Sequence, residues 1–375
     1  MQTSTGRPSG LDPTGTAEIV EIKRPEIVDT GRLRLVGFPK KRFNLPVATL
    51  PLEVQTFEHA TALSLPGVGK GNHNVGAAYH RAGRLITETQ RAKPGKGWSP
   101  SPLGIPTSDR DPLRLEGRTF YAGRSASHFG HILLETLTRF WPDVDYSSYD
   151  HFLAIPNHGD SSDSGRNSLF GKLVYTANLP FDKFVVVGDQ PLECESLDVP
   201  SAPFHVAAVA DPRFLDVFER VGARVERGRY QGTLSEFPER IYLSRSRLKA
   251  KPRSADKRSA SNETDIEDML AREGFQTVHP QELPLDQQIG MARRAEVIAG
   301  CDGSALHLAI FARPGTRMLA LDTRRVPNQF LINRARGIDA VHVWAATEEV
   351  ANRMATWTID PDRVMAGLDL LLAED

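Results

Sequence analysis

Two series of short apolar segments that alternate with amphipathic ones constrain the fold of this chain most. The first begins near residue 119, where FYAG, HFLAIP and KFVVVG are typical of strands, and GHILLETLTRFW and SLFGKLVYTANL are typical of helices. The second begins at residue 241, where the strand-like segments IYLSRS, FQTVHP, EVIAG and RMLALD alternate with helix-like segments such as NETDIEDMLAREG and LDQQIGMARRA. Because this alternation is typical of parallel sheets covered by helices, the sequence predicts an α/β fold.

The length of the chain and a loop-like segment near its middle predict two main domains. A chain of 375 residues is long enough for about two domains with filled cores. The segment GRYQGTLSEFPER reads as a linker, so we expect two Rossmann-like halves with a ligand cleft between them. Hairpins are predicted in residues 19–90 and a long surface loop in 91–112. The expected divisions are a disordered tail (1–18), an N-terminal α/β domain with an irregular extension (19–235), a C-terminal Rossmann-like domain (236–345) and a C-terminal helical segment (346–375).

Composition excludes several classes of protein. A formal net charge of −1 and a pI near 6.8 argue against a nucleic-acid-binding protein. The two cysteines, Cys194 and Cys301, lie far apart, so we expect no disulfide, and a reducing compartment fits. No run of about 18 apolar residues is present, and the N-terminus lacks the apolar core of a signal peptide. We therefore predict a cytoplasmic protein with at most peripheral contact at the inner membrane.

The segment GCDGSALHLAIF follows the predicted strand EVIAG and has two interpretations. Gly300 and Gly303 permit a tight turn and Ser304 can cap the next helix, which is a structural role. Alternatively the turn receives a ligand, because helix starts bind anions and ligands of open α/β sheets lie at the carboxyl ends of strands. His307 is then either a hydrogen-bonded core residue or a ligand contact.

A basic run follows the predicted strand IYLSRS and reaches the next helix. Residues 245–258, RSRLKAKPRSADKR, carry seven basic residues and one acid. They read either as a solvated loop or as a phosphate site, since guanidinium groups bind phosphate oxygens in pairs. The helix after the run has Asn262 as its predicted N-cap and Gly274 just past its end.

The segment HFGHILLE carries the residues best suited to proton transfer. His131 and Glu135 are four residues apart, so they share a helix face, and His128 lies just before them. A general base oriented by a carboxylate fits this pattern better than zinc, because no third ligand is evident, and a purely structural pair is the alternative. The segment PDVD, residues 142–145, reads as an exposed turn rather than a divalent-cation motif. Dinucleotide, P-loop and α/β-hydrolase motifs do not occur.

Several of these segments together resemble glycosyltransferase family 61. The ordered set is IYLSRS, then Arg258 four residues before the helix start, then EGFQTVHPQELPLDQQIGMARRAEVIAGCDGSALHLAIFARPGTRMLAL. It resembles the family's C-terminal region, and HFGHILLETLTRFWP resembles its N-terminal motif, so the resemblance covers residues 119 to 325. Asp302 and Leu308 stand where many eukaryotic members have histidine and asparagine, and the sequence is more similar to bacterial, capsule-associated members.

The resemblance implies an inverting glycosyltransferase of GT-B architecture that uses a nucleotide-activated sugar and no catalytic metal or other cofactor. His131, as general base, and Glu135 would act from the N-terminal, acceptor-side domain. If His131 were not the base, Glu135, Asp302 and His128 would follow. Asp302 is assigned to a sugar or ribose hydroxyl. The residues implied around the donor, all on the C-terminal domain, are Arg245, Arg258, Asn262, Glu263, Gln288, Asp302, Gly303, Ser304 and His307.

We therefore predict a transferase that moves a sugar from a nucleotide-sugar donor to a glycan or glycolipid acceptor in bacterial surface polysaccharide synthesis. One alternative is another transferase or a hydrolase that acts on a phosphorylated substrate in the same cleft. The other is a non-catalytic protein that binds sugar nucleotides or polysaccharide, and such a protein could lose the His131–Glu135 pair. The donor sugar, nucleobase, acceptor, linkage and oligomeric state stay open.

Overall fold

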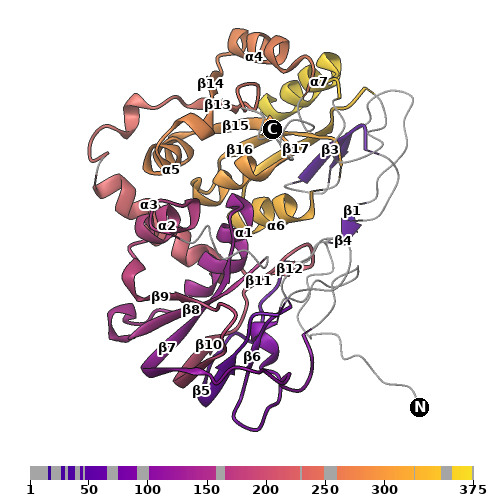
Figure 1. Cartoon of the computed structure of the whole chain (residues 1–375). Coiled ribbons are helices and arrows are strands. Elements are labelled where there is room, and N and C mark those ends of the chain that lie inside the picture. Colours follow the sequence, from indigo (N-terminus) through magenta and orange to yellow (C-terminus); the bar gives the residue numbers. More distant parts are fainter. Residues whose placement is uncertain are drawn as a thin grey trace, which may run out of the picture. The chain divides into compact units, whose positions relative to one another are not determined.

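The computed structural model describes residues 16–17, 27–29, 33–38, 43–44, 47–65, 75–90, 101–157, 165–228, 230–248, 260–324, 326–347 and 357–373. Two compact units share these residues. The first unit takes those from 48 to 221, and the second takes those up to 47 and from 222 onward. In Figure 1 the sheet of the first unit runs from indigo (β5 and β6) to rose (β10), and β15, β16 and β17 of the second unit are orange to yellow. The described part of the chain contains no helix long and apolar enough to cross a membrane.

A six-stranded mixed sheet forms the centre of the first unit. Four neighbouring strands are parallel: β10 (Leu192–Pro200), β7 (Leu113–Ser125), β8 (His151–Pro156) and β9 (Phe184–Val186). On the other side of β10, β5 (Val54–Ala62) pairs antiparallel with β10, and β6 (Ala78–Tyr79) pairs antiparallel with β5. The antiparallel pairing of β5 with β6 is the kind expected of the predicted hairpins. The apolar runs of β7 and β8 are buried, because helices or loops cover both faces of parallel strands.

The helices of the first unit follow the strand ends. The segment predicted as one helix consists of α1 (Phe129–His131), the π-helical turn η2 (Ile132–Thr136) and the 3-10 turn η3 (Leu137–Phe140). Helix α2 spans Leu169–Thr176 and is capped by Ser168, and α3 (Leu215–Arg227) crosses the division between the units. The short elements are β11 (Phe204–His205), β12 (Val209–Ala210), η1 (Thr87–Thr89), η4 (Tyr146–Ser148), η5 (Phe181–Lys183) and η6 (Pro212–Phe214).

The second unit contains a seven-stranded sheet in the order β14-β13-β15-β16-β17-β3-β2. All neighbouring strands are parallel except the edge pair β3 and β2. The chain leaves β13 toward β14 on one side and then passes to β15 on the other side, so the switch point lies between β13 and β15. The bounds are β13 (Arg240–Leu243), β14 (Gln276–Val278), β15 (Val297–Cys301), β16 (Arg317–Asp322), β17 (Asp339–Trp344), β3 (Leu33–Val36) and β2 (Ile27–Asp29).

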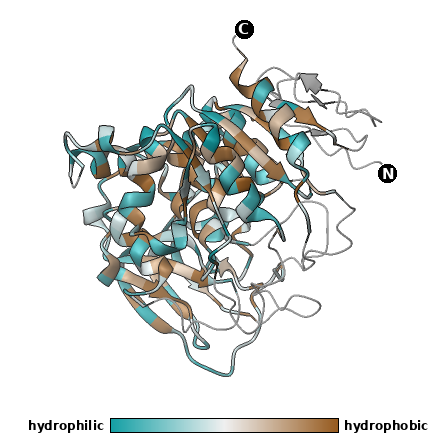
Figure 2. Cartoon of the chain, turned by 90° about the horizontal axis from the view of Figure 1, so that it is seen from above, coloured by the Kyte–Doolittle hydropathy of each residue, from teal (hydrophilic) through white to brown (hydrophobic). Residues whose placement is uncertain are grey.

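Helices cover this parallel sheet. Helices α4 (Glu263–Arg272) and α7 (Pro361–Leu372) contribute to one large core with the strands, including Ile266, Leu319 and Leu368. The others are α5 (Leu285–Arg294), the 3-10 helix η10 (Ser304–Phe311) and α6 (Pro327–Arg336), with short turns η7 (Leu234–Glu236) and η9 (Pro280–Glu282) and a strand pair β1 (Thr16–Ala17) and β4 (Phe43–Asn44). Figure 2 shows largely hydrophobic strands and helices of mixed colour, as one-sided burial requires.

Most predicted elements from residue 119 onward are confirmed, and the described residues form a mixed α/β fold. The strand HFLAIP coincides with β8, and RMLALD coincides with β16. Strand β3 pairs with β17 in the second sheet, a partner that the sequence did not reveal because the two strands are about 300 residues apart. Of the predicted tail (1–18), only β1 is among the described residues. Residues 91–100 of the predicted loop also lie outside the described residues.

Candidate functional site

In the second unit, the carboxyl ends of β13 and β15 bring Arg245 beside the turn that begins helix η10. The backbone N–H of Arg245 donates to Glu263 Oε1 at 2.8 Å, and its Nη1 donates to the backbone oxygen of Asp302 at 3.2 Å. The side chain of Arg245 is half-buried. Parallel strands with a switch point bind ligands at this edge, so Arg245 has the position expected of a ligand contact.

Glu263 lies beneath Arg245 as the first residue of α4. Its side chain is buried, and Oε1 also accepts from the hydroxyl of Tyr242 at 3.2 Å. Burial raises the pKa of Glu263, although the Arg245 N–H and the charge of Arg245 act in the opposite direction. Its Oε2 has no hydrogen-bond partner among the described residues. Through its Oε1, Glu263 fixes the backbone of Arg245 at this edge of the sheet.

The turn from Gly300 to Ser304 is close-packed on both sides. A Cβ atom on Gly300 would lie 3.1 Å from both the backbone oxygen of Leu243 and Cδ2 of Leu306, and one on Gly303 would lie 3.4 Å from Nη1 of Arg245. A side chain at Gly303 would therefore touch the guanidinium of Arg245. The prediction that Ser304 caps the helix is wrong. The N-cap is Gly303, without a side-chain bond, because the helix already begins at Ser304.

The carboxylate of Asp302 is bound by two residues that follow β16. Its Oδ2 lies 2.8 Å from Nε of Arg324, and the Thr323 hydroxyl lies 3.3 Å from each carboxylate oxygen. The sequence did not identify Arg324. The signal was available, because Arg324 lies two residues after the predicted strand RMLALD, as Arg245 lies two residues after β13.

Two other predicted donor residues bond to the protein backbone, and a third falls outside the described part. Asn262 does occupy the N-cap position of α4, but its side chain forms no cap. Its amide instead donates to the Ile359 oxygen at 2.9 Å and accepts from the Ile359 N–H at 2.8 Å. Gln288 Nε2 donates to the oxygens of Pro280 and Leu283 at 2.7 and 3.0 Å. Arg258 lies outside the described residues.

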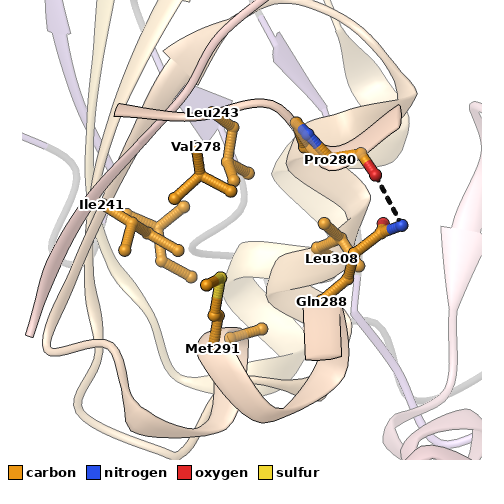
Figure 3. A pocket seen from close by; sticks show the side chains of 9 residues that line it. Ile241, Leu243, Val278, Pro280, Gln288, Met291 and Leu308 are labelled. Atoms are coloured by element: carbon orange, nitrogen blue, oxygen red, sulfur yellow. Dashed lines mark hydrogen bonds between the residues drawn. The ribbon is translucent and has the colours of Figure 1, made fainter. Parts of the chain in front are cut away.

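Gln288 also borders a small apolar pocket between the sheet and two helices. Figure 3 shows side chains from β13, β14, α5 and η10 around it, with the Gln288 amide directed at Pro280. The residues that line it are Ile241, Leu243, Val278, Pro280, Gln288, Met291, Ala292, Ile298 and Leu308. This lining is almost wholly apolar, so the pocket offers little to a charged or sugar ligand.

His307 is the outer end of a chain of buried polar side chains. Its Nδ1 lies 2.8 Å from Gln329 Oε1, and Gln329 Nε2 donates to Asn333 Oδ1 at 2.8 Å. Asn333 Nδ2 then lies 3.1 Å from His342 Nε2, whose Nδ1 lies 2.6 Å from Asp322 Oδ2. All of these except His307 are buried. His307 is thus hydrogen-bonded to the core, which was one of its two predicted roles.

In the first unit, His131 and Glu135 form the predicted pair. Nδ1 of His131 is hydrogen-bonded to Oε2 of Glu135, and the side chains are 35% and 12% exposed. The ring of His128 lies edge-on to that of His131, with centroids 5.4 Å apart. Asn157, directly after β8, is buried, and its amide lies 3.5 Å from Glu135 Oε2. The pair thus lies at the carboxyl ends of β7 and β8, an edge at which α/β proteins bind ligands.

Two irregularities of the backbone hold this pair close to the sheet. Strand β7 bulges between Tyr121 and Gly123 against β8, and Gly123 has φ +87°. A Cβ on Gly123 would lie 2.2 Å from the backbone oxygen of Glu135, so only glycine allows this approach. Facing it, the helix widens into η2, where the Leu137 N–H bonds to Ile132 five residues back. Single π-helical turns often occur at functional sites.

The PDVD segment is an exposed turn, as predicted. Asp143 and Asp145 are exposed, and the Asp145 carboxylate accepts from the Ser147 N–H at 2.9 Å, so it caps η4. Hydrogen bonds from the hydroxyl and N–H of Ser147 lower the pKa of Asp145. The described residues contain no cluster of three side chains of the metal-binding types.

Comparison with known families gives one match. The family model described as Glycosyltransferase 61 matches residues 129–319, just over half of the chain. The matched segment begins at α1 and ends within β16, so it includes His131, Glu135, Arg245 and Asp302 but not Arg324. No curated protein matches the chain.

Proposed function

This chain belongs to the glycosyltransferase 61 family, and on that premise we propose that it is an inverting glycosyltransferase. It transfers a sugar from a nucleotide-sugar donor to a glycan or glycolipid acceptor, in the synthesis of a bacterial surface polysaccharide on the cytoplasmic side of the membrane. The GT-B architecture and a reaction that needs no metal are parts of the same proposal.

The edge of the second unit's sheet supports the donor site. Arg245 lies at the switch point with its guanidinium against the turn at Gly303, and it uses only Nη1 in a bond to the described protein. The remaining N–H groups of the guanidinium match the oxygens of a diphosphate. As the bond to the sugar breaks, negative charge develops on this diphosphate, and a fixed guanidinium stabilises it.

The His131–Glu135 pair carries the catalytic part of the proposal. Because Nδ1 of His131 is bonded to a carboxylate, the proton on Nδ1 is held there and Nε2 is the atom that accepts a proton. A carboxylate also stabilises the imidazolium that forms, as in hydrolases that pair histidine with an acid. Neutral imidazole is basic enough for this step near neutral pH, whereas a carboxylate with its ordinary pKa is a weaker base.

The reaction follows as a single displacement. Nε2 of His131 removes the proton of the acceptor hydroxyl while the oxygen attacks the anomeric carbon. The bond from that carbon to the diphosphate oxygen breaks on the opposite face, and the electron pair leaves with the nucleoside diphosphate. The configuration at the anomeric carbon is therefore inverted, and no covalent intermediate with the enzyme forms.

Turnover and donor binding of matched variants test the proposal. The activity is first found with a panel of uridine, guanosine, cytidine and thymidine sugar nucleotides and candidate glycan acceptors. His131→Ala should lower turnover by about a hundredfold or more while donor affinity is retained. His80→Ala is the matched control, because among the described residues the hydrogen bonds of the His80 side chain stay within its own turn, to Ala82 and Arg84. If folded His131→Ala binds donor and turns over at the wild-type rate, His131 is not the base.

Chelation tests the proposed independence from metal. Exhaustive treatment with a chelator should leave turnover unchanged. Asp143→Asn should also leave turnover unchanged, because Asp143 is exposed and the other acid of PDVD, Asp145, caps η4. Loss of activity that manganese or magnesium restores would return PDVD to consideration as a cation motif.

A further inference from the structure

Three adjacent parallel strands of the second unit deliver one charged residue each to the same edge of the sheet. Arg245 follows β13, Asp302 follows β15 and Arg324 follows β16. The strands lie in the order β13-β15-β16, so Asp302 stands between the two arginines. Both arginines bond to it, Arg324 through Nε to the carboxylate at 2.8 Å and Arg245 through Nη1 to the backbone oxygen at 3.2 Å.

Asp302 is already occupied by the protein. Its side chain is 8% exposed, and its two carboxylate oxygens contact Thr323 and Arg324. A sugar or ribose hydroxyl would have to compete with these donors. The carboxylate is therefore better placed to orient a guanidinium than to bind a ligand hydroxyl, which differs from the role assigned to it from the sequence.

Arg324, in contrast, has hydrogen-bonding capacity left. A guanidinium carries five N–H donors, and in the described part of the chain Arg324 bonds only through Nε. Its side chain is 35% exposed, so its terminal nitrogens are not sealed in the core. Two guanidinium groups beside the turn at Gly303 also suit an anion with more than one negative charge, because each can bind a separate group of oxygens.

We propose that Arg324 is a second diphosphate-binding residue that closes on the donor with Arg245, and that Asp302 is the positioning residue that orients it. This inference rests on the proposed function. The Arg324 fork binds one phosphate of the nucleoside diphosphate and the Arg245 fork binds the other. The competing interpretation is an ion pair that only ties the turn after β15 to the turn after β16.

Calorimetric titration with inorganic pyrophosphate and with the four nucleoside diphosphates separates these interpretations. Arg324→Gln should weaken binding by about 10- to 100-fold, as expected for lost bonds between charged groups. Arg324→Lys keeps a charge near Asp302 but loses the fork, so it should fall between wild type and Arg324→Gln. Arg313→Gln is the control, because it removes another arginine of this unit, one that bonds to Glu226 at 3.0 Å, and should leave affinity unchanged.

The role of Asp302 is tested in the same titrations by a double-mutant cycle. If Asp302 acts through Arg324, Asp302→Asn changes affinity in the wild type but has no further effect in Arg324→Gln. Independent, additive effects would overturn the positioning role.

The outcomes also distinguish this inference from the proposed function. Weakened binding in Arg245→Gln together with wild-type affinity in folded Arg324→Gln would overturn the inference and leave the donor site standing. Wild-type affinity in both variants would overturn the donor site itself. A lower free energy of unfolding in Arg324→Gln without any change in affinity would show that the Arg324–Asp302 ion pair only joins the turn after β15 to the turn after β16.

Discussion

Nδ1 of His342 lies 2.6 Å from Oδ2 of Asp322, and neither side chain is exposed to solvent. Burial lowers the pKa of His342 to about 3 and raises the pKa of Asp322 well above its usual range. The stability due to His342 is lost as the pH falls below the unfolded histidine value, and that due to Asp322 is lost as the pH rises above the unfolded carboxyl value. The two residues therefore have opposite effects on the pH dependence of folding.

We expect these effects to cancel between about pH 4 and 6.5, the unfolded pKa values of the two groups. In this window the unfolded pair holds one proton, on His342, and burial in the folded state favours the arrangement in which that proton lies on Asp322. Asp322→Asn removes the compensation, so its stability should fall by up to about 1.4 kcal/mol per pH unit on going from pH 6.5 to 4.5, relative to wild type. Urea unfolding at several pH values measures this. Asp268→Asn, on an exposed part of α4, is the control, and equal pH slopes in wild type and Asp322→Asn would contradict the assignment.

Gly123→Ala should destabilise the first unit by about 2 kcal/mol or more. The new Cβ would meet the Glu135 oxygen at 2.2 Å, and alanine rarely adopts φ +87°. Gly104→Ala should change the free energy of unfolding by less than about 0.5 kcal/mol, because no atom lies within 4 Å of its added Cβ. Urea unfolding compares them. Equal free energies of unfolding for Gly123→Ala and Gly104→Ala would mean that β7 and η2 lie farther apart than the distance from Gly123 to the Glu135 oxygen indicates.

Asn262→Ala should lower the free energy of unfolding by about 1 to 3 kcal/mol, since both bonds to the Ile359 backbone are lost. The sequence assigned Asn262 to the donor, so the same variant is titrated with nucleoside diphosphates. We expect unchanged affinity in the folded variant. A loss of affinity without a loss of stability would support the donor role instead.

The polar chain behind His307 predicts which ring nitrogen carries its proton. Met318 Sδ lies 3.3 Å from Asn333 Nδ2 and 3.7 Å from Gln329 Nε2, which orients both amides, so Gln329 Oε1 must accept from His307 Nδ1. Nitrogen NMR of the histidine-labelled protein should show a protonated Nδ1 in neutral His307, with His307→Asn for assignment. Gln329→Leu should reduce that signal. A neutral ring protonated only at Nε2 would reverse the direction of the chain.

Local patterns in the sequence predicted most elements after residue 119 and the contact between His131 and Glu135. Short apolar runs predicted the strands β8 and β16, and a spacing of four residues predicted the contact of His131 with Glu135. Both signals lie within a single element. Capping was predicted less well. Asn262 has the right residue type for a cap, but a partner 97 residues away competes for its amide. The π-helical turn lies against Gly123 of β7, a contact between two elements, and the pattern of the helix itself did not reveal it.

Short stretches of sequence are enough to locate most strands and helices after residue 119 and the residues that follow the strands, because hydrophobic periodicity and turn residues act over a few positions. Which of those residues meet depends on how the strands are ordered in the folded sheet. Arg324 binds Asp302 across 22 residues because β15 and β16 are neighbours in the sheet. Asp322 and His342 form a pair because β16 and β17 are also neighbours. The order of the strands depends on the burial of whole sheet faces against helices, and this free energy is summed over the entire unit. A pattern of a few neighbouring residues therefore does not predict the order.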